Sequence, residues 1–181
     1  MHREYNKATR RMNKEKVSQD YLLEYLTQHN VNLKRLSDLM GVSNGSMMGA
    51  FRHDPNRHGK PMKFSAANIE KMNEAIATMA DQIRSGLVTF GSAETYTNKR
   101  SGETYDPATV PQLRALQRWF KLGPFFQRVV GWTQSRTTSS LYSTTARAYG
   151  TITADQVSRI DTELLSVAGR LGSIQVEVTE D

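Results

Sequence analysis

The 181-residue sequence contains no cysteine. This excludes a disulfide framework, a cysteine metal site and a cysteine nucleophile, and it fits a reducing compartment. No apolar run approaches the roughly 20 residues that span a bilayer. The N-terminal sequence MHREYNKATRRMNKEK also lacks the apolar stretch of a signal peptide. We therefore expect a cytoplasmic protein with no membrane partner.

Motifs of the common enzyme classes are also missing. The sequence has no phosphate-binding loop and no glycine-rich dinucleotide fingerprint. The four histidines all lie in the first third, at His2, His29, His53 and His58. The last two are near neighbours, but only Asp54 adds a carboxylate there. We expect no metal, no cofactor and no catalytic residue.

Positive charge is concentrated at one end of the chain, whose net charge is +6. Residues 1–63 hold 12 of the 24 Lys and Arg but only 6 of the 18 Asp and Glu. A basic face of this kind indicates a polyanionic partner, with nucleic acid favoured over anionic lipid. The alternative is a solvated face that only aids solubility.

Apolar residues at helical spacing predict four helices in the first half. The predicted helices cover residues 21–30, 33–41, 45–53 and 66–85. Gly41 ends the second of them, because glycine readily adopts the left-handed conformation that closes a helix. The longest helix carries the clearest apolar stripe.

The second half repeats this order. Gly41 and Gly131 are 90 residues apart, and the same offset pairs apolar positions before and after them. An offset of 88 continues the match through the long helix. The pairs are Leu23 with Leu113, Leu26 with Leu116, Leu36 with Phe126, Leu39 with Val129, Met40 with Val130, Phe51 with Leu141, Ile69 with Val157, Met72 with Ile160, Ile76 with Leu164, Met79 with Val167 and Ile83 with Leu171. We interpret this pattern as an internal duplication.

Short β-prone stretches lie between and after the two halves. A hairpin is predicted in which Thr95–Thr97 pairs with Glu103–Tyr105, around the turn NKRSG. The C-terminal sequence SIQVEVTED alternates apolar and polar residues and predicts a strand. Pairing of this strand with the equivalent stretch SGLVTF, residues 85–90, would tie the halves together.

Two stretches have the layout of short helix, glycine turn and short helix. They are LKRLSDLMGVSNGSMMGAFRH, residues 33–53, and GPFFQRVVGWTQSRTTSSLYS, residues 123–143. Both resemble the helix-turn-helix of phage repressor and Cro proteins, the XRE or lambda-repressor-like family. The resemblance covers about residues 20–85 and 111–171. It implies a compact helical domain that places its third helix in the DNA major groove. Met47 and Trp132 are expected in the core or an interface.

The expected fold is therefore mainly α, with two tandem helix-turn-helix domains and a small β hairpin or strand element between them and at the C-terminus. The expected segments are a basic N-terminal arm or helix at 1–19, the first domain at 20–86, a linker with the hairpin at 87–109, the second domain at 110–173 and a C-terminal strand or tail at 174–181.

Side-chain chemistry around the third helices predicts the DNA contacts. In the second copy, Gln134 suits adenine and Arg136 suits the O6 and N7 atoms of guanine. The predicted base contacts are Asn44, Ser46, Gln134, Ser135, Arg136 and Thr138. The predicted backbone contacts, which position without reading sequence, are Arg10, Arg11, Lys14, Lys16, Arg52, Arg57, Lys60, Lys63, Thr133 and Arg147. The alternative is that this Ser/Thr-rich helix is ordinary polar surface.

These observations favour a sequence-specific double-stranded DNA-binding protein that is not an enzyme. The two copies would act as a fused pseudo-dimer, in a transcriptional regulator of phage or mobile-element type. The alternative is a protein-interaction or structural module that uses the same helices to bind a protein. RNA binding ranks third and a helical enzyme last. A homo-oligomer or a protein partner stays open.

Overall fold

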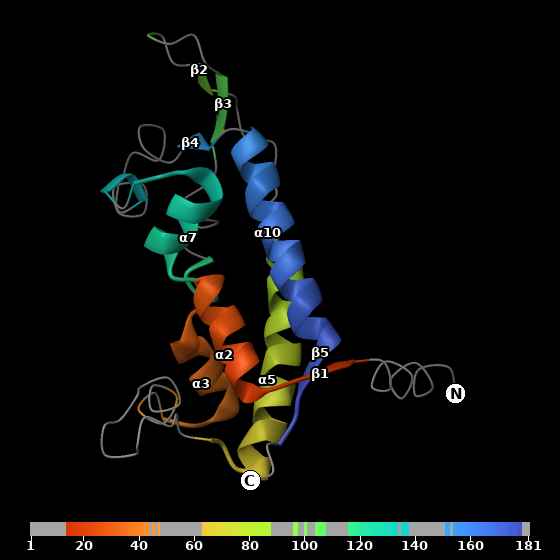
Figure 1. Cartoon of the computed structure of the whole chain (residues 1–181). Coiled ribbons are helices and arrows are strands. Elements are labelled where there is room, and N and C mark those ends of the chain that lie inside the picture. Colours follow the sequence, from red (N-terminus) through yellow and green to blue (C-terminus); the bar gives the residue numbers. More distant parts are fainter. Residues whose placement is uncertain are drawn as a thin grey trace. The chain divides into compact units, whose positions relative to one another are not determined.

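A computed structural model describes residues 14–43, 45, 47, 63–87, 96–97, 100, 104–107, 116–133, 135–137, 151–152 and 154–178. These residues are mainly helical with a few short strands, as expected (Figure 1). No described helix is long and apolar enough to cross a membrane. The chain divides into two compact units. Unit 1 comprises Met1–Gln28, Leu33–Asp81 and Ala168–Asp181, and unit 2 comprises His29–Asn32 and Gln82–Val167.

Unit 1 contains two short helices, parts of two long helices and a pair of strands. These elements are β1 (Glu15–Val17), α2 (Gln19–Gln28), α3 (Leu33–Met40), most of α5 (Ala66–Ser85), the end of α10 (Ala154–Ser173) and β5 (Ile174–Val176). Serine hydroxyls cap the N-termini of α2 and α5. The Ser18 Oγ accepts the Tyr21 N–H at 3.1 Å, and the Ser65 Oγ accepts the Asn68 N–H at 3.3 Å. The predicted apolar stripe of α2 is buried, with Leu22 and Leu26 fully inaccessible.

The two strands of unit 1 form a parallel pair in which Glu15 lies opposite Ile174 and Val17 opposite Val176. Residues 15–17 form a strand, where an arm or a helix was expected, and this strand pairs with β5. The expected partner of β5 was the stretch 85–90, of which residues 88–90 lie outside the described residues. Both edges of β5 have partners at Val176. One edge bonds to β1, while the side chain of Asn73 takes the other. It accepts the Val176 N–H at 2.7 Å and donates to the Val176 carbonyl at 3.0 Å.

Unit 2 contains a further short helix, the rest of the two long helices and a three-stranded sheet. Its elements include β2 (Tyr96–Thr97), β3 (Thr104–Pro107), α7 (Leu122–Val130) and β4 (Thr151–Ile152). The predicted hairpin is confirmed, since β2 and β3 pair antiparallel. The sequence did not predict β4, which adds antiparallel to the other edge of β3.

Repeated positions meet inside unit 2. Val31 and Phe120 form an antiparallel bridge. On either side of it, Lys121 N–H donates to the Asn30 carbonyl at 2.8 Å and Asn32 N–H donates to the Trp119 carbonyl at 2.6 Å. Asn30 itself has a positive φ of 60°, a conformation that asparagine tolerates better than most residues. At the 90-residue offset Asn30 corresponds to Phe120, so equivalent segments of the two halves pair with one another.

The repeated pattern is present in both element bounds and burial. Helices α5 and α10 each have 20 residues and begin 88 positions apart. The paired apolar positions within them are buried alike. These pairs are Ile69 with Val157, Met72 with Ile160, Ile76 with Leu164, Met79 with Val167 and Ile83 with Leu171. The same holds before the long helices, where Leu36 and Phe126 are both buried.

Candidate nucleic-acid interface

A left-handed glycine ends the short helix in each half. Gly41 follows α3 with φ 68°, and Gly131 follows α7 with φ 72°. After Gly41, the Val42 N–H donates back to the Ser37 carbonyl at 3.1 Å, which is the bonding of a Schellman turn. After Gly131, the Trp132 N–H donates to the Phe126 carbonyl at 3.2 Å. In both halves, a left-handed glycine and a backbone hydrogen bond therefore close the helix at the matching position, as the repeat predicts.

Helical structure resumes immediately after each turn. In unit 1, residues 45 and 47 are helical, and the Met47 N–H donates to the Ser43 carbonyl at 3.2 Å. In unit 2, residues 135–137 are helical. Met47 is fully buried, and Thr137, which lies 90 positions later, is 3% exposed. The inner side of each new helix is therefore anchored at the same position.

The start of the second helix is fixed by Thr133. Its Oγ1 accepts the Arg136 N–H at 3.1 Å, and its carbonyl accepts both the N–H and the hydroxyl of Thr137. Thr133 is thus the N-cap of this helix. Thr133, Ser135 and Arg136 are exposed, while Thr137 faces the core. Backbone amides at a helix start attract anions, and here they lie beside a guanidinium.

A cluster of aromatic side chains packs next to the turn at Gly131. Trp132 is 2% exposed and stacks on Phe126, with ring centroids 5.1 Å apart and planes inclined by 20°. Phe126 meets Phe125 edge to face, and Phe125 lies 4.5 Å from Phe120. The expectation that Trp132 is a core residue is confirmed. The guanidinium of Arg136 lies over the Trp132 ring, 4.4 Å from its centroid, which is cation–π distance.

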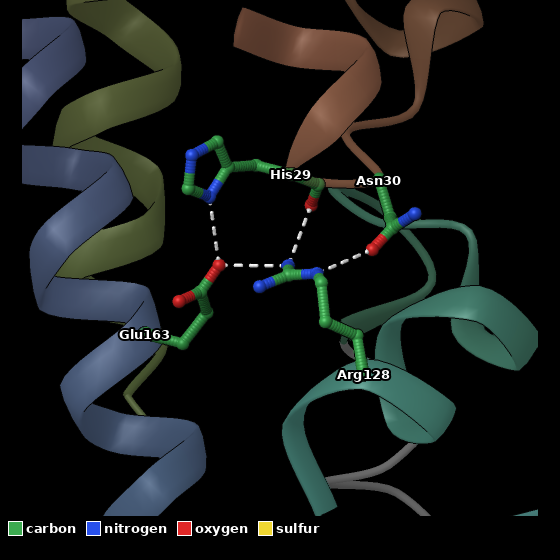
Figure 2. Close-up of polar contacts among 4 residues, drawn as sticks. All are labelled: His29, Asn30, Arg128 and Glu163. Carbon is green, nitrogen blue, oxygen red and sulfur yellow. Dashed lines mark hydrogen bonds and ion pairs between the residues drawn. The ribbon is translucent and has the colours of Figure 1, made fainter.

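A polar network holds the last turn of α7 (Figure 2). Arg128 Nη2 lies 2.7 Å from Glu163 Oε1 and donates to the His29 carbonyl at 3.2 Å. Its Nε donates to Asn30 Oδ1 at 2.9 Å, and His29 Nδ1 lies 2.9 Å from the same Glu163 oxygen. Since an ionised carboxylate only accepts hydrogen bonds, Nδ1 of His29 carries a proton. The network therefore joins α7 to α10 and to the residues after α2, all within unit 2.

The network also sets the ionisation of Glu163. Partial burial by itself raises the pKa of this carboxyl, but the hydrogen bonds and charges of Arg128 and His29 outweigh it. The pKa of Glu163 is consequently lowered below its ordinary value of 4.5. The glutamate is therefore an anion at neutral pH, and its charge orients Arg128 at the last turn of α7, four residues before Trp132.

Unit 1 has a second arginine network. Arg170 Nη1 lies 2.6 Å from Glu15 Oε2, and Arg170 Nε donates to the Tyr21 hydroxyl at 2.8 Å. The guanidinium also lies over the Tyr21 ring, 5.1 Å from its centroid. The hydrogen bond and charge of Arg170 lower the pKa of Glu15. Arg170 thus ties α10 to β1 and α2.

The three described lysines of the predicted backbone contacts lie in unit 1. Lys14 and Lys16 line a groove of about 760 Å³, and Glu70 and Glu74 line the same groove. Lys16 also pairs with Glu177 at 3.5 Å, with both side chains more than half exposed. Lys63 is exposed beside the start of α5. The surface around β1 is therefore mixed in charge and not uniformly basic.

Of the predicted base contacts, the structure places Ser135 and Arg136 together, next to the predicted backbone contact Thr133. The other predicted contacts lie outside the described residues. These are Asn44, Ser46, Gln134, Thr138, Arg10, Arg11, Arg52, Arg57, Lys60 and Arg147.

Sequence reasoning missed Arg128, Glu163 and Trp132 as parts of the site. One signal was available for Glu163. At the 88-residue offset it corresponds to Ala75, a buried position of α5, and a carboxylate at such a position needs a cationic partner. For Trp132, the signal was an arginine four residues later, near the start of the next predicted helix.

Among the described residues, no group of three or more His, Asp or Glu side chains is arranged to hold a metal ion. No protein-family model matches the sequence, and no curated protein or solved structure matches it either.

Proposed function

We propose that this chain binds double-stranded DNA through two helix-turn-helix units, with the second unit reading sequence. The observation that carries the proposal is the second turn, from Gly131 to Thr137. A left-handed glycine, an N-cap hydroxyl and a buried Thr137 leave Ser135 and Arg136 exposed at the beginning of a helix. This is where helix-turn-helix proteins meet base edges, and arginine pairs with guanine there.

The repeat supports a paired mode of binding. Turns with the same glycine conformation occur in both halves, followed by helical residues with the same buried anchor position. The positive charge of residues 1–63 supplies backbone attraction. The proposed activity is binding without catalysis. A regulatory role of phage or mobile-element type rests on the helix-turn-helix resemblance.

A salt titration tests the proposal. The full chain is titrated with a random-sequence duplex and with a duplex enriched from a random pool, over a range of salt concentrations. We expect affinity to fall with salt, with a slope of about −0.9 per phosphate contact. Arg136→Ala should cost about 1–3 kcal/mol on the enriched duplex and much less on random DNA.

The matched control is Arg159→Ala. Arg159 is an exposed arginine of the same unit, but it lies on α10 and pairs with Asp155 at 2.8 Å. Its removal should leave the preference between the two duplexes unchanged. No salt-dependent binding to either duplex would refute DNA binding and favour the protein-interaction alternative.

A further inference from the structure

The groove of unit 1 follows β5, with β1 on one side of this strand and α5 on the other. Strand β5 pairs with β1 along one edge, and its other edge bonds to the side chain of Asn73 on α5. Lys14 and Lys16 come from β1 and the residue before it, and Glu70 and Glu74 come from α5. All four line the groove and belong to unit 1. The lysines therefore reach it from one side of β5 and the glutamates from the other.

Three of these four charges have no intramolecular partner. Within the part of the chain that the structure describes, the side chains of Lys14, Glu70 and Glu74 form no ion pair. The two glutamates lie four residues apart, so they share one face of α5. Lys16 pairs with Glu177, but both side chains are more than half exposed, and a pair so exposed contributes little. The groove thus has a basic side and an acidic side that are both open to a partner.

Apolar side chains lie between the two charged sides. Ile174 and Val176 of β5 line the groove and are buried, whereas Val178, which also lines it, is 47% exposed. Ala66 on α5 is exposed there too. An apolar centre with a charged border is the composition of a protein–protein contact.

We propose that two copies of this chain associate through this groove about a twofold axis that is parallel to β5. In a twofold interface both copies use the same patch, so the patch must be complementary to itself. The groove meets this condition, because rotation about such an axis brings the basic side of one copy onto the acidic side of the other. The exposed Val178 side chains then lie between the charged contacts. This association is independent of DNA binding.

The charges of the groove favour a second copy over a polyanion. Three carboxylates line it, Glu70, Glu74 and Glu177, against the two lysines. Such a surface repels nucleic acid, whereas a second copy presents the opposite charge at each side. Because the charged contacts lie near solvent, each contributes little, and the association is weak and dependent on salt.

Sedimentation equilibrium of the full chain, freed of nucleic acid, tests whether the chain associates. The range runs from about 1 μM to about 1 mM, which covers weak association. We expect the average mass to rise with concentration from 20.4 kDa towards twice that value, and to rise less at high salt. A mass that stays at 20.4 kDa over the whole range would overturn the proposal.

Charge reversal tests whether the groove is the interface. One variant combines Lys14→Glu with Lys16→Glu, and the other combines Glu70→Lys with Glu74→Lys. Each variant alone places like charges opposite each other, so its self-association should weaken about 10-fold or more. An equimolar mixture of the two variants should associate again, because one groove is then wholly acidic and the other wholly basic. Unchanged self-association of either variant, or a mixture that stays monomeric, would overturn the proposal.

Two single variants complete the test, with thermal unfolding followed by circular dichroism to verify that each protein is folded. Val178→Asp should weaken self-association without reversing any charge of the border. The matched control is Lys71→Glu, since Lys71 is an exposed residue of α5 that does not line the groove. It should associate as the wild type does. Equal weakening by Val178→Asp and Lys71→Glu would mean that net charge and not the groove controls association, and would overturn the proposal.

Discussion

Replacing Arg128 with alanine should destabilise unit 2 specifically. The substitution removes the contact of Nη2 with Glu163, the hydrogen bond of the same atom to the His29 carbonyl and the hydrogen bond of Nε to Asn30. It leaves behind a Glu163 side chain that is only 17% exposed and has lost its strongest partner. The substitution therefore removes both the cation that pairs with Glu163 and the hydrogen bonds that join α7 to residues 29–30.

The magnitude follows from the burial of the partners. A hydrogen bond to a charged group contributes about 1.5–3 kcal/mol, and stranding a buried group costs about as much. The Arg128 side chain is 36% exposed, so solvent screens part of this interaction. We expect Arg128→Ala to lower the free energy of unfolding by about 1–3 kcal/mol.

The assay uses the distribution of tryptophans. Trp119 and Trp132 are the two tryptophans of the chain, and both are buried in unit 2. Urea unfolding followed by tryptophan emission therefore reports on this unit. The control is Arg159→Ala, since the Arg159–Asp155 pair is exposed by 58% and 71%. Such a pair contributes about 0–1 kcal/mol. If the two variants lose equal stability, the network does not hold α7 and the reasoning is refuted.

Three further predictions concern stability at low pH, the buried side of α10 and the backbone conformation of Gly131. The lowered pKa of Glu163 contributes stability above its ordinary value of 4.5 that is lost as pH falls through the lowered value. Emission-monitored stability should thus fall more steeply below pH 4.5 in the wild type than in Glu163→Gln. Leu164→Ala should lower the free energy of unfolding by about 2–5 kcal/mol, because Leu164 is fully buried. The control Leu165→Ala should change it by almost nothing, because Leu165 is 52% exposed. Similar losses for both variants would argue that Leu164 is not a core residue. Gly131→Ala should lower the free energy of unfolding by about 1–2 kcal/mol, because alanine is strained at the positive φ of this position. Gly169→Ala inside α10 should instead raise it by about 0.5–1 kcal/mol. The opposite order of stability in thermal unfolding would exclude a strained turn.

Local patterns predicted much of the fold. The long helix expected at residues 66–85 has those bounds, and the glycines that follow α3 and α7 are left-handed. These features depend on neighbouring residues alone. Apolar spacing defines a helix face, and glycine is the residue that adopts positive φ without strain.

The remaining features depend on partners that are far apart in the sequence. The three residues Glu15–Val17 carry no pattern of their own and become a strand because β5 offers its edge. Asn73 bonds to Val176, 103 residues later, and His29 to Glu163, 134 residues later. A single sequence gives no register for such contacts, because side-chain type alone does not say which distant group is the partner.

The central claim is that the turn from Gly131 to Thr137 reads duplex sequence. Its most direct test is selection of bound duplexes from a random pool by the full chain, in parallel with Arg136→Ala. The wild type should enrich a motif that contains a required guanine, and Arg136→Ala should lose the preference at that one position while retaining the rest. Enrichment of the same motif by both proteins, or of none by the wild type, would contradict the account.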